Sequence, residues 1–125
     1  MLQVKPGEIS EILARSRQSA IAASRNTFDS LNGGFGGAPK FPHPMELEML
    51  LRSEDGDDLT IVSTSLEAMA GRGLFDHLGG GWHRYCVDAA WTVPHFEKML
   101  YDNSLLLRIH GRARHLGVGS RSMHD

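Results

Sequence analysis

Apolar residues recur at helical spacing in several stretches of this 125-residue chain. Over residues 7–28, apolar positions three or four apart predict an amphipathic helix that starts close to Pro6. A second helix is expected from Pro44, because proline suits the first helical turn, and it should end between residues 53 and 56. The apolar positions of these two helices are Ile9, Ile12, Leu13, Ala20 and Ala23, and then Leu47, Leu50 and Leu51.

Two further helices are predicted downstream. The third is expected to be capped by Asp57 or Asp58 and to end at Gly71 to Gly73. The fourth is expected over residues 95–116, after Pro94, with a frayed tail over 118–125. Their apolar faces consist of Leu59, Val62, Leu66 and Met69, and of Phe96, Met99, Leu100, Leu106, Leu107 and Ile109.

Two segments interrupt this helical pattern. Residues 31–43 are rich in glycine and proline, which predicts an ordered loop. Residues 82–87 and 91–93 are β-prone and predict a short hairpin near 82–93. The expected fold is therefore mostly α and forms a single incomplete helical domain, with a leading helix over 1–30 and the remaining helices and the hairpin over 44–117.

Composition narrows the function classes. The formal net charge of −2 gives no basic field, so we predict no nucleic-acid partner. Cys86 is the only cysteine, which excludes an intrachain disulfide and favours an intracellular setting. No apolar run has the length of a signal peptide or a membrane span, so we expect a cytoplasmic protein without membrane contact.

Candidate chemistry is concentrated between residues 79 and 103, where aromatic and polar side chains alternate. Such a mixture suits a polar, ring-shaped ligand. His95 at a predicted helix start would stay neutral and able to accept a proton, although a capping or packing role is an equal alternative. On a strand, His83 and Arg84 would point to opposite faces.

Acidic residues in the same segment offer acid–base partners for His95. Asp88, Glu97 and Asp102 are candidates for glycoside-type chemistry, and Lys98 with Asp102 could instead form a simple helical ion pair. A metal site is not expected, because the histidines follow no recognised ligand spacing. The glycine loop is interpreted as structural, because no strand precedes it and no Ser or Thr follows Lys40.

Two motifs together carry a resemblance to a known family. They are Gly-Gly-Phe-Gly-Gly-Ala-Pro-Lys-Phe-Pro over 33–42, and Gly-Gly-Gly-Trp-His-Arg-Tyr over 79–85 followed by Trp-Thr-Val-Pro-His-Phe-Glu-Lys-Met-Leu-Tyr-Asp-Asn over 91–103. Over residues 28–107 the chain resembles the YyaL / spermatogenesis-associated protein 20 family. That family combines a thioredoxin-like domain with an (α/α)6 toroid similar to N-acylglucosamine 2-epimerases and six-hairpin glycosidases. The resemblance implies a partial toroid, with a fragment expected because no thioredoxin-like segment precedes it.

The resemblance further implies a sugar-sized pocket. No cofactor is predicted. His95 would be the base, Glu97 or Asp88 the acid, and Arg84 and Lys98 would orient polar groups. The other implied ligand contacts are Trp82, His83, Tyr85, Trp91, Tyr101 and Asp102. The alternative is a non-catalytic helical module that self-associates through its uncovered apolar face, or that needs the remainder of the toroid.

Overall fold

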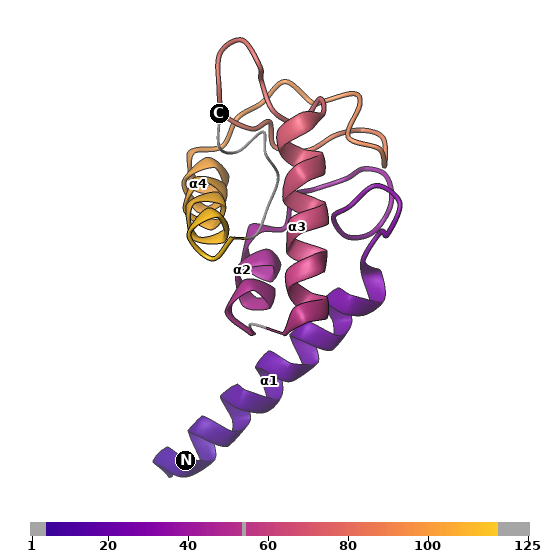
Figure 1. The fold of residues 1–125 in the computed structure, drawn as a ribbon. Helices are drawn as coiled ribbons and strands as arrows, with labels where there is room; N and C mark the ends of the chain where they lie inside the picture. Colours follow the sequence, from indigo (N-terminus) through magenta and orange to yellow (C-terminus); the bar gives the residue numbers. More distant parts are fainter. Residues whose placement is uncertain (1–4, 54, 118–125) are drawn as a thin grey trace.

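The computed structural model describes residues 5–53 and 55–117, and over these residues the chain forms four helices (Figure 1). They are α1 (Pro6–Thr27), α2 (Pro44–Ser53), α3 (Gly56–Gly71) and α4 (Leu100–His115). No strand is present among the described residues, so the mostly α prediction is confirmed. The predicted frayed tail, 118–125, lies outside the described residues.

Helices α2, α3 and α4 pack around one apolar core, and the C-terminal part of α1 lies along their edge (Figure 1). The periodic apolar residues explain this arrangement for α2 and α3, whose predicted stripes are largely buried. The predicted face of the fourth helix was only partly right, because Leu106 and Ile109 are buried whereas Phe96, Leu100 and Leu107 are 84%, 85% and 67% exposed. The fully buried side chains include Leu47 and Leu50 of α2, Val62, Leu66 and Met69 of α3, and Leu106 and Ile109 of α4. Burial of such side chains is the main favourable term in folding.

The N-terminal half of α1 projects away from this core (Figure 1). Its apolar side chains Ile9, Ile12 and Leu13 are 46%, 55% and 57% exposed. The predicted amphipathic helix therefore forms, but nothing within the described chain covers its apolar face. No helix among the described residues combines the length and apolar character needed to cross a membrane.

The start of α3 differs from the prediction. Asp55 is the N-cap, and its carboxylate accepts hydrogen bonds from the backbone N–H groups of Asp57 and Asp58. The predicted caps were therefore wrong. Asp58 is instead fully buried and accepts two hydrogen bonds from Arg25 of α1, at 2.7 and 2.8 Å. These bonds hold the pKa of Asp58 below its usual value despite burial, and they fasten α1 to α3.

The start of α4 was also predicted wrongly, because the helix begins at Leu100 and not at His95. The preceding residues are extended and pair with the chain near Tyr85. The N–H of His95 donates to the carbonyl of Tyr85, and the N–H of Arg84 donates to the carbonyl of Glu97. Lys98 consequently lies before the helix, and the predicted ion pair between Lys98 and Asp102 does not form.

The predicted hairpin is absent. Cys86 forms isolated bridges with Lys40 and with Pro94, so its backbone joins the glycine loop to the segment before α4. The turn over 88–93 is held by the side chain of Asp88, which accepts from the N–H groups of Ala90, Thr92 and Val93. A side chain thus takes the backbone donors that a hairpin ladder would have used.

Candidate functional site

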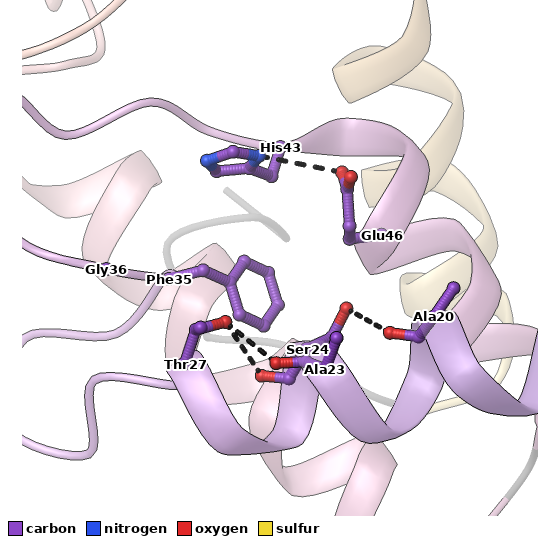
Figure 2. Close-up of a pocket in the computed structure, with 8 residues that line it drawn as sticks. All are labelled: Ala20, Ala23, Ser24, Thr27, Phe35, Gly36, His43 and Glu46. Atoms are coloured by element: carbon purple, nitrogen blue, oxygen red, sulfur yellow. Dashed lines mark hydrogen bonds and ion pairs between the residues drawn. The ribbon is translucent and has the colours of Figure 1, made fainter.

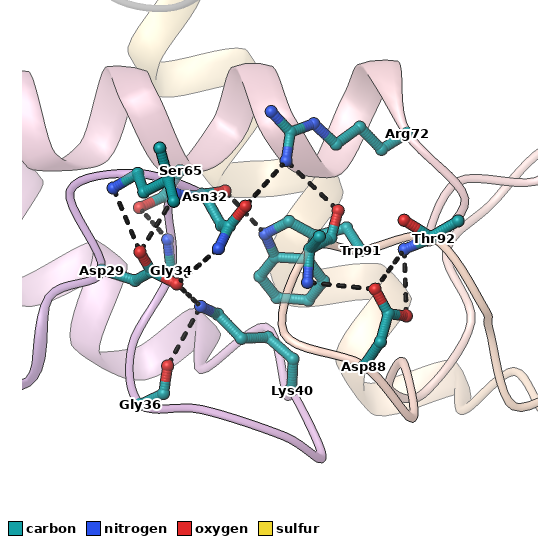
Figure 3. Close-up of polar contacts among 12 residues, drawn as sticks. Asp29, Asn32, Gly34, Gly36, Lys40, Ser65, Arg72, Asp88, Trp91 and Thr92 are labelled. Carbon is teal, nitrogen blue, oxygen red and sulfur yellow. Dashed lines mark hydrogen bonds and ion pairs between the residues drawn. The ribbon is translucent and has the colours of Figure 1, made fainter.

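The glycine loop before α2 is fixed by a buried lysine (Figure 3). Lys40 is fully buried, and its ammonium donates to Asp29 Oδ2 at 2.6 Å and to the carbonyl of Gly36 at 3.0 Å. Burial disfavours the Asp29 carboxylate, but hydrogen bonds from Lys40 and Asn32 outweigh it and keep the pKa of Asp29 far below its usual range. The loop is therefore ordered by an internal ion pair.

Trp91 closes the other side of this loop (Figure 3). Its ring is fully buried, its Nε1–H donates to the carbonyl of Asn32 at 3.0 Å, and the ammonium of Lys40 lies 5.6 Å from the ring centroid. Gly34 donates its N–H to Ser65 Oγ of α3, and a Cβ at Gly34 would lie 2.5 Å from the Trp91 ring. These contacts support the structural interpretation of the glycine loop.

Three polar side chains come together beside this scaffold. His95 Nδ1 and Arg84 Nη1 each lie 3.6 Å from Glu97 Oε2, and the three side chains are 43% to 48% exposed. Because 3.6 Å exceeds hydrogen-bond length, these are loose polar contacts on an open surface. We refer to Arg84, His95 and Glu97 as the imidazole–carboxylate cluster.

A row of stacked rings supports the cluster. The Tyr85 ring stacks on His95 with centroids 4.8 Å apart, and on Phe41 with centroids 4.7 Å apart. Phe41 in turn meets His43 edge to face at 6.4 Å. The ring row fixes the His95 imidazole, but the flat faces of Tyr85 are already used inside the protein.

His43 lines a separate pocket of about 370 Å³ between α1 and the start of α2 (Figure 2). The small residues Ala20 and Ala23 of α1 leave this space, and Phe35 forms part of its wall. His43 has a φ of 49°, which is uncommon for a residue with a side chain, and its Nδ1 lies 3.7 Å from Glu46 Oε2. Sequence reasoning missed this second imidazole–carboxylate pair, although a histidine between Pro42 and Pro44 was an available signal.

Comparison with known proteins gives the chain a family context. No family model matches the chain. Spermatogenesis-associated protein 20 of Mus musculus and that of Homo sapiens are each 38% identical to it over 122 residues, covering 83% of this chain. This chain is a relative of spermatogenesis-associated protein 20.

A functionally uncharacterised protein of Caenorhabditis elegans is 45% identical over 98 residues, or 72% of this chain. The chain spans only 13% to 16% of the length of these relatives. Spermatogenesis-associated protein 20 names a family and no reaction, so the activity has to be argued from the site itself.

Several residues predicted at the site have structural contacts instead. Trp91 is fully buried, and Trp82, 8% exposed, stacks on His110 with centroids 4.8 Å apart. Trp91 therefore has no free ring face, and Trp82 already stacks on His110. The Asp88 carboxylate is surrounded by backbone N–H groups of Val93, Thr92 and Ala90, which keep its pKa below the usual value.

Lys98 and His83 are likewise engaged. Lys98 donates to Asp76 Oδ2 at 2.7 Å and to the carbonyl of Gly80 at 2.8 Å, so it closes the turn over 76–81. His83 is buried against Phe96, with ring centroids 5.3 Å apart, and its Nδ1 has no hydrogen-bond partner. These side chains do not join the imidazole–carboxylate cluster through any contact in the described chain.

The two remaining predicted contacts lie in the first turn of α4. Tyr101 is 64% exposed, and its hydroxyl lies 3.7 Å from the Met45 sulfur. Asp102 is half-buried. Among the described residues, no three His, Cys, Asp or Glu side chains are grouped as a metal site would require.

Proposed function

We propose that the imidazole–carboxylate cluster of Arg84, His95 and Glu97 forms part of a binding surface for a sugar-like ligand. The proposal is supported by one observation in particular: Arg84 and His95 each lie 3.6 Å from the same oxygen of Glu97 while all three side chains remain nearly half exposed. Exposed donors and acceptors at a common point suit the hydroxyl groups of a sugar. The resemblance to toroidal sugar epimerases and glycosidases favours the same ligand class.

In this proposal His95, held by the ring row, accepts a proton from the ligand, and Glu97, 3.6 Å from its Nδ1, is the candidate acid. An imidazole is the usual general base near neutral pH. Arg84 orients an oxygen of the ligand. Asp88 is not the acid in this proposal, because both of its carboxylate oxygens accept hydrogen bonds from backbone N–H groups in the turn over 88–93.

Tyr85 and Phe41 buttress His95 and do not stack on the ligand, because they stack on each other within the ring row. The ligand would instead meet the outer face of the His95 imidazole. The rest of the binding surface would come from further parts of a partial (α/α)6 toroid, the fold that the resemblance favours. No cofactor is part of the proposal.

The test is to add N-acetyl-D-mannosamine or N-acetyl-D-glucosamine and to monitor binding by the melting temperature and by NMR of the His95 ring protons. Binding should raise the melting temperature, and His95→Ala should abolish that rise. His115→Ala removes an exposed histidine from the last turn of α4 and is the matched control. Full stabilisation of His95→Ala would contradict the assignment. Proton transfer is tested by deuterium uptake from D2O at the sugar carbon next to the carbonyl.

Self-association is a second candidate function, favoured by the exposed apolar row on α1. Ile9, Ile12 and Leu13 are each about half exposed, and such a row on a projecting helix suits burial against a second copy of the chain. Light scattering over a concentration series should then show a dimer that Leu13→Gln dissociates. Leu31→Gln, which changes an isolated and 84% exposed leucine, is the control. A monomer at all concentrations would contradict this candidate.

A further inference from the structure

Three arginines converge on one carboxylate between α2 and α4. Arg108 Nη2 lies 2.6 and 2.7 Å from the two oxygens of Glu48, Arg52 Nη2 lies 3.4 Å away, and Arg112 Nη1 lies 3.8 Å away. Three positive charges against one negative charge leave a surplus of two. A single carboxylate does not require three guanidinium groups, so this arrangement calls for an explanation.

A hollow of about 440 Å³ lies beside this group of charges. The arginine side chains are 48% to 60% exposed, whereas the Glu48 side chain is only 15% exposed. The guanidinium groups are therefore open to solvent while the carboxylate is largely covered. The residues that line the hollow are Leu51, Arg52, Arg108, Gly111, Arg112, His115 and Leu116.

Cations near the end of α4 are also expected for a simpler reason, because they complement the helix dipole. That reason applies equally to Arg112 and Arg114. Arg114, however, lines a different hollow with Phe75 and Trp82, and Arg52 lies in the last turn of α2, so two helix ends meet these cations. Each helix end supplies only about half of one negative charge, so the ends of α2 and α4 together supply about one, which is less than the surplus of two. Complementing the dipole therefore leaves the convergence unexplained.

We propose that this hollow binds the phosphate group of a small, soluble phosphate monoester. A phosphate monoester carries roughly two negative charges at neutral pH, which matches the surplus. Guanidinium groups present planar pairs of donors that fit phosphate oxygens. Leu51 and the space above Gly111, where an added Cβ would contact nothing within 4 Å, can accommodate the remainder of the molecule.

The experiment is to titrate the 125-residue chain with glycerol 3-phosphate at constant ionic strength and to measure binding by calorimetry and by NMR. Arg112→Gln should weaken binding about tenfold, the loss expected for one charge-assisted contact. Arg114→Gln is the matched control, because it removes the same charge from the same helix two residues away and should leave the affinity unchanged.

Glu48→Gln provides an opposite prediction. It removes the competing negative charge while keeping the side-chain shape, and it should tighten binding severalfold. It also keeps the proposal testable if Arg112→Gln fails to fold. Equal losses in Arg112→Gln and Arg114→Gln would overturn the proposal, because they would indicate a diffuse charge effect. Absence of binding would overturn it as well, and so would retention on phosphatidic acid vesicles without any response to glycerol 3-phosphate.

Discussion

The side chain of Asn103 pairs with both backbone groups of Trp82, as a neighbouring strand would. Asn103 Oδ1 accepts from the Trp82 N–H at 2.7 Å, and Asn103 Nδ2 donates to the Trp82 carbonyl at 2.9 Å. One residue of α4 thereby holds the irregular segment that leads from α3 to the imidazole–carboxylate cluster. The residues around Trp82 form no strand, and an amide side chain satisfies their backbone groups instead.

Asn103→Ala should lower the free energy of unfolding by about 2 kcal/mol, because two partly buried backbone groups lose their partners. Urea denaturation would measure the loss. Asn103→Asp keeps the acceptor for the Trp82 N–H, but it removes the donor to the carbonyls of Trp82 and Met99 and places a carboxylate oxygen against them, so it should also destabilise the fold. An unchanged midpoint in Asn103→Ala would show that the segment is held by other contacts.

Lys40→Met should cost about 3 kcal/mol, because it leaves the Asp29 carboxylate without its buried cation. Lys40 is fully buried and the Asp29 side chain is 19% exposed, so solvent can only partly replace the lysine. Adding Asp29→Asn to Lys40→Met should recover part of the stability, since the orphaned charge disappears. No recovery in the double variant would mean that the methionine itself disturbs the packing. Chemical denaturation of the three variants gives the comparison.

Gly34→Ala and Gly36→Ala form a matched pair. Both glycines have φ near 75°, but an added Cβ meets the Trp91 ring at Gly34 and nothing within 4 Å at Gly36. Gly36→Ala should cost about 1 kcal/mol for the left-handed backbone alone. Gly34→Ala should cost roughly 1 to 3 kcal/mol more because the ring has to move. Similar melting temperatures for the two variants would refute the proposed close approach of Gly34 to Trp91.

His110 predicts an acid-sensitive fold. Burial lowers the pKa of His110 to about 4, compared with an unfolded value near 6.5. Between these values the unfolded chain binds a proton that the folded chain does not, so stability falls as the pH drops from about 6.5 to about 4. The loss should approach about 3 kcal/mol, because His110 is only 8% exposed. His110→Gln should flatten the pH dependence in that window, and an unchanged slope would contradict the assignment.

The helices that follow from local pattern were predictable. Leu47, Leu50 and Leu51 lie on one face because of helical spacing, and that face is buried. The failures have non-local causes. The N–H of His95 donates to the carbonyl of Tyr85, and α4 begins only at Leu100. Sequence rules for a helix start consider neighbouring residues only, so they could not predict this contact.

The candidate site was predictable only in part. His95, Glu97 and Arg84 are close in sequence, and the structure brings them together. His43 lies some fifty residues earlier, and it reaches the same ring row only through its contact with Phe41. The arginine group on Glu48 joins α2 to α4, so its convergence depends on helix packing that the pattern alone does not specify.

The reactivity of the Cys86 thiol can report local opening of the fold. Its side chain is fully buried, and burial together with Asp88 raises the pKa of the thiol to about 11. A thiol in that state reacts poorly with alkylating reagents. Because the backbone of Cys86 is bridged to both Lys40 and Pro94, the thiol becomes reactive only when the glycine loop and the segment before α4 separate. The rate at which a maleimide labels the native chain therefore measures how often that junction opens.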